Sequence, residues 1–302
     1  MKQINSILIL GLGVMGRGVA KGFADADIPT TVRSRRAGAS APDGVTLVTE
    51  LPAACPDLVI ELLPEELELK QAAYRELEQA WGDADYLIAT GTSGLDLEAL
   101  ARPLTRPERL IALHYFMPAD TVPLVEVMAG PASPREAVDR AAEVLRRAGK
   151  LPLKIYRPLI GHVVNRLQHA MLHEAYCMIA EGLCSVEDVD LAATRMLGPR
   201  MCSTGLVLQK DLSGLQVNRD SQRAIVPHLF HNRTPSPIVG ELVARGESGV
   251  AAGKGFYDWS GKTATEVRGA SAASLARLLE FLEANTWPEA AAFQPRSRGG
   301  ER

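Results

Sequence analysis

A histidine and a glutamate in neighbouring apolar stretches are the side chains of this sequence best suited to chemistry. His114 follows the stretch 109–113, and Glu126 lies within the stretch 123–127. If the second stretch returns beside the first, the carboxylate fixes the imidazole tautomer and stabilises its protonated form, as a general base requires. A buried histidine with no catalytic role is the alternative interpretation of this pattern taken alone.

A glycine-rich turn near the N-terminus predicts a dinucleotide site. It follows the apolar run 7–10 and opens a helix-like segment, 15–26. Glycines at this spacing allow a tight turn, close approach of the backbone to a pyrophosphate, and close packing of helix on strand, while the helix N-terminus faces the phosphates. A secretory signal is the alternative, and the glycines and the lack of an A-x-A cleavage site oppose it. The cofactor-binding residues expected here are Gly11, Gly13, Val14, Met15 and Gly16.

The end of the second expected strand bears on which dinucleotide binds. NAD-selective sites usually have an acid there that bonds the ribose 2′-hydroxyl, whereas this chain has Ser34 between Arg33 and Arg35. A small hydroxyl leaves room for a 2′-phosphate, and a guanidinium can bind that phosphate through paired hydrogen bonds. We therefore expect Ser34 and Arg35 to favour NADP over NAD. A solvated basic turn without a ligand is the alternative.

Several motifs that follow one another along the chain resemble those of the 3-hydroxyacyl-CoA dehydrogenase family. The chain especially resembles members of the carnitine and gulonate dehydrogenase type, which are short-arm members because they lack a helical arm after the second strand. The resemblance runs from about residue 7 to residue 259. The matching segments are residues 11–16, 57–65 with Lys70, 91–95, 114–126, 164–166, 211–215 and 253–257.

The resemblance implies roles for individual residues. The matching histidine, His114, is the base and Glu126 is its partner, while Ser93 and Asn165 line the site of the substrate hydroxyl. It also implies that Glu65 and Lys70 lie near the nicotinamide half of the cofactor.

Three of these residues have purely structural alternatives. Ser93 could cap the helix expected from about residue 95, and Asn165 could bond a neighbouring carbonyl. Lys70 could pair with Glu66 four residues earlier on one helix face. No metal site is expected, because His169 and His173 have no further ligand at a convincing spacing.

A missing segment limits the choice of substrate. Between the second strand and Asp57 the chain has only residues 37–56, where relatives that use acyl-CoA have a long helical arm that contacts the CoA moiety. We therefore expect a small, polar, free 3-hydroxy acid as the substrate.

Composition indicates an ordinary soluble enzyme of the cytoplasm. The chain has 302 residues, 46% of them hydrophobic and 23% charged, and a net charge of −3. That charge gives no electrostatic reason to expect nucleic acid or an anionic membrane as a partner. No apolar run approaches the roughly 20 residues that span a bilayer, and the four cysteines are scattered without metal-ligand spacing.

The order of expected elements predicts an α/β fold, a doubly wound Rossmann-type parallel sheet followed by a smaller all-helical domain. Strands are expected near 5–10, 28–33, 45–48, 57–63, 85–90, 109–113, 123–127 and 152–155, with helices near 15–26, 65–81, 95–101 and 134–149. After residue 157 the pattern is helical, with a long buried helix over 161–183 and further helices near 186–197, 235–246 and 271–285. We expect a dinucleotide-binding domain, 1–157, and a helical domain, 158–302, that serves substrate binding and dimerisation.

These features together predict an oxidoreductase that transfers hydride between NADP, or NAD, and the 3-hydroxyl of a small polar 3-hydroxy acid, with His114 as the base. One alternative is a 3-hydroxyacyl-CoA dehydrogenase for short acyl chains. The other is a non-catalytic dinucleotide-binding protein of the crystallin kind, for which a retained base would have no use.

Overall fold

The computed structural model describes residues 3–35 and 38–285. By its contacts the chain divides into two units, residues 1–167 and 168–302. The predicted domain boundary between residues 157 and 158 stays a prediction.

The first unit is built on one eight-stranded sheet in the order β3-β2-β1-β4-β5-β6-β7-β8. Neighbouring strands are parallel except β6 and β7, which are antiparallel. Each expected strand is present, so the predicted Rossmann-type sheet is confirmed. The strands are β1 Ile7–Leu10, β2 Thr30–Arg33, β3 Val45–Val48, β4 Leu58–Glu61, β5 Leu87–Thr90, β6 Leu110–Tyr115, β7 Leu124–Ala129 and β8 Leu151–Ile155.

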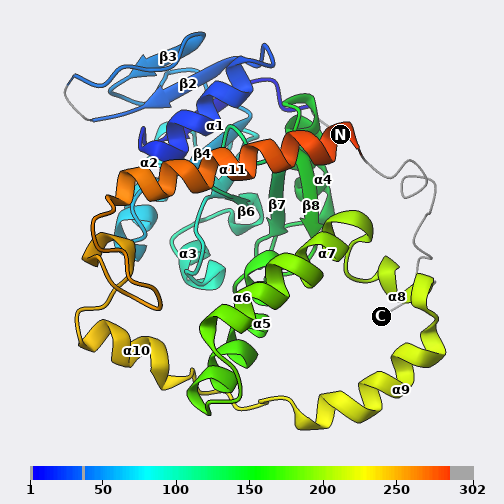
Figure 1. Ribbon diagram of the computed structural model, residues 1–302. Helices are drawn as coiled ribbons and strands as arrows, with labels where there is room; N and C mark the ends of the chain where they lie inside the picture. Colours follow the sequence, from blue (N-terminus) through cyan, green and yellow to red (C-terminus); the bar gives the residue numbers. More distant parts are fainter. Residues whose placement is uncertain (1–2, 36–37, 286–302) are drawn as a thin grey trace. The chain divides into compact units, whose positions relative to one another are not determined.

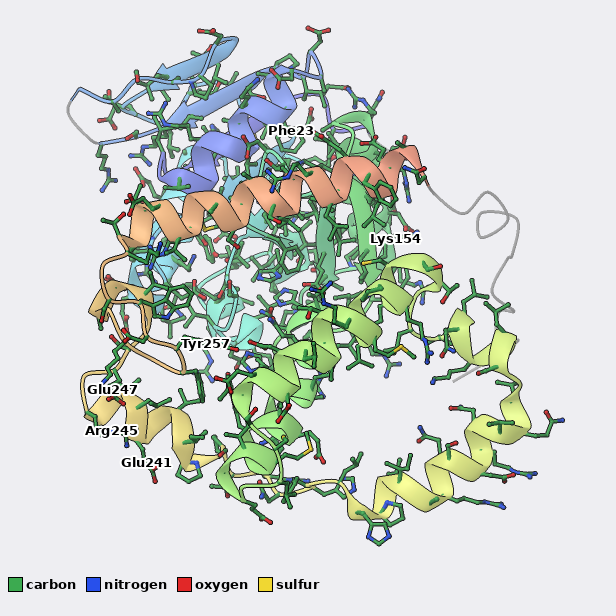
Figure 2. All side chains as sticks on the ribbon, in the orientation of Figure 1. Phe23, Lys154, Glu241, Arg245, Glu247 and Tyr257 are labelled. Atoms are coloured by element: carbon green, nitrogen blue, oxygen red, sulfur yellow. The ribbon has the colours of Figure 1, made fainter. Side chains whose placement is uncertain are left out.

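Helices cover both faces of this sheet, which is why its central strands are continuous apolar runs. On one face, α1 (Val14–Ala24) and α4 (Arg135–Arg147) pack on side chains such as Ile9 and Leu113. Phe23 of α1, labelled in Figure 2, belongs to this core. On the other face, α2 (Leu67–Trp81) and α3 (Leu97–Ala101) pack on a second set of strand side chains. Figure 1 shows these helices around the strands.

Between β2 and β4 the described residues form β3 and no helix. The predicted lack of a helical arm is therefore confirmed for residues 38–57.

The second unit, together with α5 leading into it, is helical in its described part, as predicted. Figure 1 shows these helices from green to red. The hydroxyl of Tyr257, labelled in Figure 2, donates a hydrogen bond to the Asp190 carboxylate at 2.7 Å. This bond joins the loop that contains Tyr257 to α6. No helix among the described residues is long and apolar enough to cross a membrane. The helices are α5 Val164–Ala180, α6 Val186–Ala192, α7 Gly198–Thr204, α8 Leu208–Ser213, α9 Leu215–Ile225, α10 Pro237–Ala244 and α11 Ala264–Ala284, with a π-helical turn at Ala193–Leu197 and short 3-10 turns at Val226–His228 and Val250–Ala252.

The expectation that the long helix is buried was wrong. In α5 only Ala175 and Cys177 are buried, whereas Leu167 and Met171 are 48% and 49% exposed. Periodicity shows that one face of a helix is apolar, but it does not show what covers that face.

Candidate active site

The strand register brings His114 and Glu126 together. In the antiparallel pair of β6 and β7 the two residues are direct partners, so their side chains project from the same face of the sheet. His114 Nδ1 lies 2.8 Å from Glu126 Oε2, and both side chains are buried. The predicted pairing is therefore present in the structure.

The environment of Glu126 keeps it ionised. Burial alone would raise the pKa of this carboxyl, but the hydrogen bonds with His114 and with two backbone N–H groups offset it, and the pKa lies below its ordinary value. An ionised carboxylate only accepts hydrogen bonds, so His114 Nδ1 carries the proton between them. His114 Nε2 is then the nitrogen with the lone pair, as a base requires.

Glu126 also fixes the start of α5. Its Oε1 accepts hydrogen bonds from the N–H groups of Val163 and Val164, at 2.8 and 2.9 Å. These donors are among those that a helix start leaves without partners inside the helix. Asn165 is the next residue and is half-buried, so one carboxylate links the base to the helix turn that carries Asn165.

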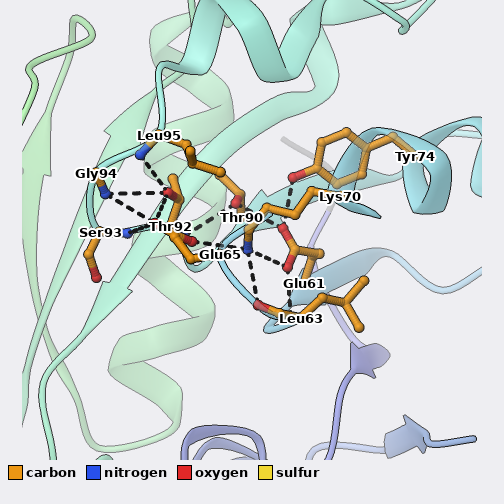
Figure 3. A network of polar contacts seen from close by, with 10 residues as sticks. All are labelled: Glu61, Leu63, Glu65, Lys70, Tyr74, Thr90, Thr92, Ser93, Gly94 and Leu95. Atoms are coloured by element: carbon orange, nitrogen blue, oxygen red, sulfur yellow. Dashed lines mark hydrogen bonds and ion pairs between the residues drawn. The ribbon is translucent and has the colours of Figure 1, made fainter. Parts of the chain in front are cut away.

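A second carboxylate organises the loop that carries Ser93, as Figure 3 shows. Glu65 accepts hydrogen bonds from the Thr92 hydroxyl and from the N–H groups of Ser93 and Gly94. Ser93 itself is exposed. It does not cap α3, because that cap is the Asp96 side chain, so the capping alternative was wrong.

Lys70 lies in a buried ion pair at the base of the same network (Figure 3). Its Nζ is 2.7 Å from Glu61 Oε1 and 3.5 Å from Glu65 Oε2, so its carboxylate partners are these two rather than Glu66. Glu61 also accepts from the hydroxyls of Tyr74 and Thr90. Lys70 therefore holds α2 to the end of β4, and direct contact of Lys70 or Glu65 with a cofactor stays a prediction.

The glycine turn has the geometry that a dinucleotide needs. Gly11 has φ +107°, and a Cβ there would lie 2.6 Å from the Leu62 carbonyl oxygen. A Cβ at Gly16 would overlap the carbonyl of Gly11, whereas one at Gly13 would meet no atom within 4 Å. Gly13 precedes α1 and gives it no side-chain cap, so the N–H groups at the helix start, where Val14 and Met15 lie, can bind a phosphate.

A pocket of about 270 Å³ lies beside this turn and is lined by Gly11, Ser34, Arg35 and Glu76 among others. Glu76, which no sequence pattern singles out, pairs with two arginines. It binds Arg33 through two contacts of 2.7 and 2.8 Å and lies 3.5 Å from Arg35. Arg33 is thus held by an acid, while Arg35 is 75% exposed.

His162, two residues before α5, lies directly beside His114. Its ring stacks on that of His114, with centroids 4.6 Å apart and an interplanar angle of 19°. One ligand atom each of His114, Glu126 and His162 lie within 4.8 Å of one another. No spacing rule could reveal this stacking, because it depends on a backbone φ of +52° at His162.

A dinucleotide turn on a Rossmann-type sheet and a buried histidine–glutamate pair define a class of protein, the nicotinamide-dependent oxidoreductases. Family models narrow the class. The NAD binding domain of 3-hydroxyacyl-CoA dehydrogenase matches residues 38–157, and its C-terminal domain matches residues 161–259. The chain belongs to the 3-hydroxyacyl-CoA dehydrogenase family, as predicted.

Individual relatives agree with this assignment. The chain is 26% identical to 5-formyl-3-hydroxy-2-methylpyridine 4-carboxylate 5-dehydrogenase of Mesorhizobium japonicum, over 93% of this chain and 99% of that one. It is 40% identical to L-carnitine dehydrogenase of Nocardiopsis dassonvillei over 52% of this chain and 48% of the relative, so it spans about half of that protein. A crystal structure of the pyridine carboxylate dehydrogenase has a TM-score of 0.85 at 24% identity, over 93% of this chain and 99% of that one, which shows a shared fold.

The family and its members establish the activity in general terms. The protein is a dehydrogenase with an NAD-binding domain, and it acts on the hydroxyl group of substrates of the 3-hydroxy acid or acyl-CoA type.

Proposed function

We propose that the protein oxidises, reversibly, the 3-hydroxyl of a small, polar, free 3-hydroxy acid, with His114 as the base. The observation that carries the proposal is the 2.8 Å contact between His114 Nδ1 and Glu126 Oε2. It leaves Nε2 to take the hydroxyl proton, and the carboxylate stabilises the imidazolium that results. When bound, the nicotinamide supplies the acceptor for the hydride that leaves the carbinol carbon.

Ser93 and Asn165 complete the proposed site. Hydrogen bonds from the Ser93 hydroxyl and the Asn165 amide would hold the substrate oxygen as it becomes a carbonyl. Glu65 and Glu126 support this proposal, since their carboxylates fix the loop of Ser93 and the helix start beside Asn165.

Two observations favour a free acid over an acyl-CoA. Residues 38–57 form no helical arm, and two similar relatives bear the names of enzymes for a pyridine carboxylate and for carnitine, which are free acids.

The proposal extends to cofactor, assembly and compartment. Exposed Arg35 beside Ser34 favours NADP over NAD, although Glu76 reduces the positive charge there.

We also propose that the protein is a homodimer. We propose a reducing compartment such as the cytoplasm as its location, and the free thiols of Cys177, Cys184 and Cys202 support this location.

The test is a direct comparison of substrates. Purified protein would be given NAD or NADP with 3-hydroxybutyrate, with 3,4-dihydroxybutyrate or with 3-hydroxybutyryl-CoA, and the reduced nicotinamide followed by absorbance. We expect turnover of a free acid. Efficient turnover of the CoA thioester with none for any free acid would overturn the proposal in favour of an acyl-CoA dehydrogenase, and no turnover at all would favour a binding protein.

A further inference from the structure

His162 has an arrangement that the proposed proton transfer does not use. Its side chain is only 2% exposed, and neither Nδ1 nor Nε2 has a hydrogen-bond partner among the described residues. A buried polar group without a partner is costly, and native proteins rarely leave one. Two such atoms on one ring therefore point to a partner that binds from outside the chain.

The backbone holds the ring in place at a conformational cost. His162 has φ +52° and follows Gly161, which has φ +78°. Residues other than glycine adopt this left-handed region uncommonly, although asparagine, aspartate and histidine do so more often than the rest, and such positions cluster at functional sites. Here the consequence is the stacking of His162 on His114.

The surroundings keep His162 neutral. Burial, and then the neighbouring His114, lower its pKa to about 4, against a smaller opposite effect of Glu126. At neutral pH the ring therefore presents one N–H donor and one acceptor. It does not compete with His114 for the proton of the reaction.

A small pocket lies beside the ring. His162, Ser93 and Met128 help to line a pocket of about 30 Å³, which is room for one or two groups the size of a water. Ser93 is the residue proposed to hold the reacting oxygen, so a group bound at His162 would be a close neighbour of the carbinol carbon.

We propose that His162 is a specificity-determining residue that hydrogen-bonds a polar group of the substrate next to the carbinol carbon, such as a hydroxyl or a ring nitrogen, and thereby selects polar substrates over alkyl ones. This inference rests on the proposed function. A bound metal ion is less favoured, because Glu126 Oε1 already accepts two backbone N–H groups and Oε2 is engaged by His114.

The test compares two substrates that differ by one hydroxyl, 3,4-dihydroxybutyrate and 3-hydroxybutyrate, in the wild type and in His162→Phe. We expect the wild type to prefer the dihydroxy acid, and His162→Phe to lower that preference by about 10- to 100-fold, mainly through KM. His162→Asn is the matched control, because asparagine tolerates a positive φ and keeps a donor and an acceptor, and it should retain part of the preference.

A binding measurement separates this inference from the proposed function. The affinity of each acid for the protein saturated with reduced cofactor is measured by calorimetry, where no turnover is needed. Loss of polar selectivity in His162→Phe supports the inference even if the reaction differs from the one proposed. The inference is overturned if the ratio of the two affinities is the same in wild type and variant, or if the purified wild type contains stoichiometric zinc that the variant lacks.

Discussion

At the scale of single residues, two stacked histidines have different surroundings, and this difference suggests different roles. His114 has a carboxylate partner at Nδ1, whereas His162 has no partner for either nitrogen among the described residues. A carboxylate stabilises the charged form of an imidazole, and burial without a partner favours the neutral form. Proton transfer therefore fits His114, and neutral hydrogen bonding fits His162.

The lowered pKa of His162 predicts how stability depends on pH. The pKa is about 4 in the folded chain, against an ordinary value of 6.5 for histidine, so between these pH values the unfolded chain takes up a proton that the folded chain does not. Stability is then lost as the pH falls, by up to about 1.4 kcal/mol per pH unit for one proton. The titratable groups that face the ring are His114 and Glu126, and they are unchanged in His162→Phe.

Urea denaturation of the apoprotein at several pH values from about 6.5 to 4.5 measures this effect. The free energy of unfolding should fall less steeply with decreasing pH in His162→Phe than in the wild type. Parallel curves for the two proteins would contradict a neutral, buried His162.

At the scale of elements, buried charges join the strand ends to the helices that follow. Glu61 at the end of β4 and Lys70 on α2 are 0% and 1% exposed, and their pairing fixes α2 beneath the loop that Glu65 and Thr92 organise. Glu126 joins β7 to the start of α5 in the same way. The positions of Ser93 and Asn165 thus depend on ion pairs and caps rather than on the strands alone.

Lys70→Met should therefore destabilise the fold. It leaves the Glu61 carboxylate buried without its cation, which costs about 3–5 kcal/mol in the free energy of unfolding. Urea denaturation measures this loss, because the midpoint and slope of the unfolding curve give the free energy of unfolding. Lys70→Met combined with Glu61→Gln removes the buried charge and should recover part of the loss, and a single variant as stable as the wild type would show that the pair is not needed.

The residues that follow β2 lead to a prediction about which cofactor the protein prefers. If Arg35 binds a 2′-phosphate, Ser34→Asp with Arg35→Ala should shift the preference from NADP toward NAD, with a loss of roughly 1.5–3 kcal/mol in NADP binding. Dissociation constants for the two reduced cofactors, measured by nicotinamide fluorescence in the wild type and in the variant, would show this shift. Equal affinity of the native protein for both cofactors, or a preference for NAD, would contradict the assignment and would agree with Glu76 neutralising this turn.

The sequence was sufficient for the strands and for the histidine–glutamate pair, because both depend on local signals. Apolar runs mark buried parallel strands, and two such runs with one short connection predicted the pairing of β6 with β7. It missed α7, α8 and α9, which are short segments of 6 to 11 residues. It also missed Glu76 and the stacking of His162 on His114, because those contacts depend on backbone angles and on distant elements.

At the scale of the whole molecule, the helical unit has apolar side chains that its own described residues leave exposed. Leu215, Val217 and Ile225 of α9 are 58%, 63% and 58% exposed, and Phe281 of α11 is 61% exposed. No residue of α6 to α11 is buried. Exposed apolar surface of this extent is typical of a subunit interface.

We therefore expect a homodimer in which a second copy covers these helices. Light scattering at micromolar concentration should give twice the mass of the chain, and Val217→Asp should shift the population toward monomer and lower the thermal midpoint. A wild-type protein that is monomeric under these conditions would refute the prediction, and Val48→Asp on β3 is a control that leaves the helices unchanged.

The central claim is that the His114–Glu126 pair performs the proton transfer, and the most direct test is the turnover number of His114→Gln beside its affinity for the reduced cofactor. General-base catalysis contributes about 10²–10⁴-fold, so we predict a loss of turnover in that range with cofactor affinity unchanged. Glu126→Gln should also lose turnover, since an amide cannot stabilise the imidazolium. Turnover of His114→Gln within a few-fold of the wild type would remove His114 from the mechanism.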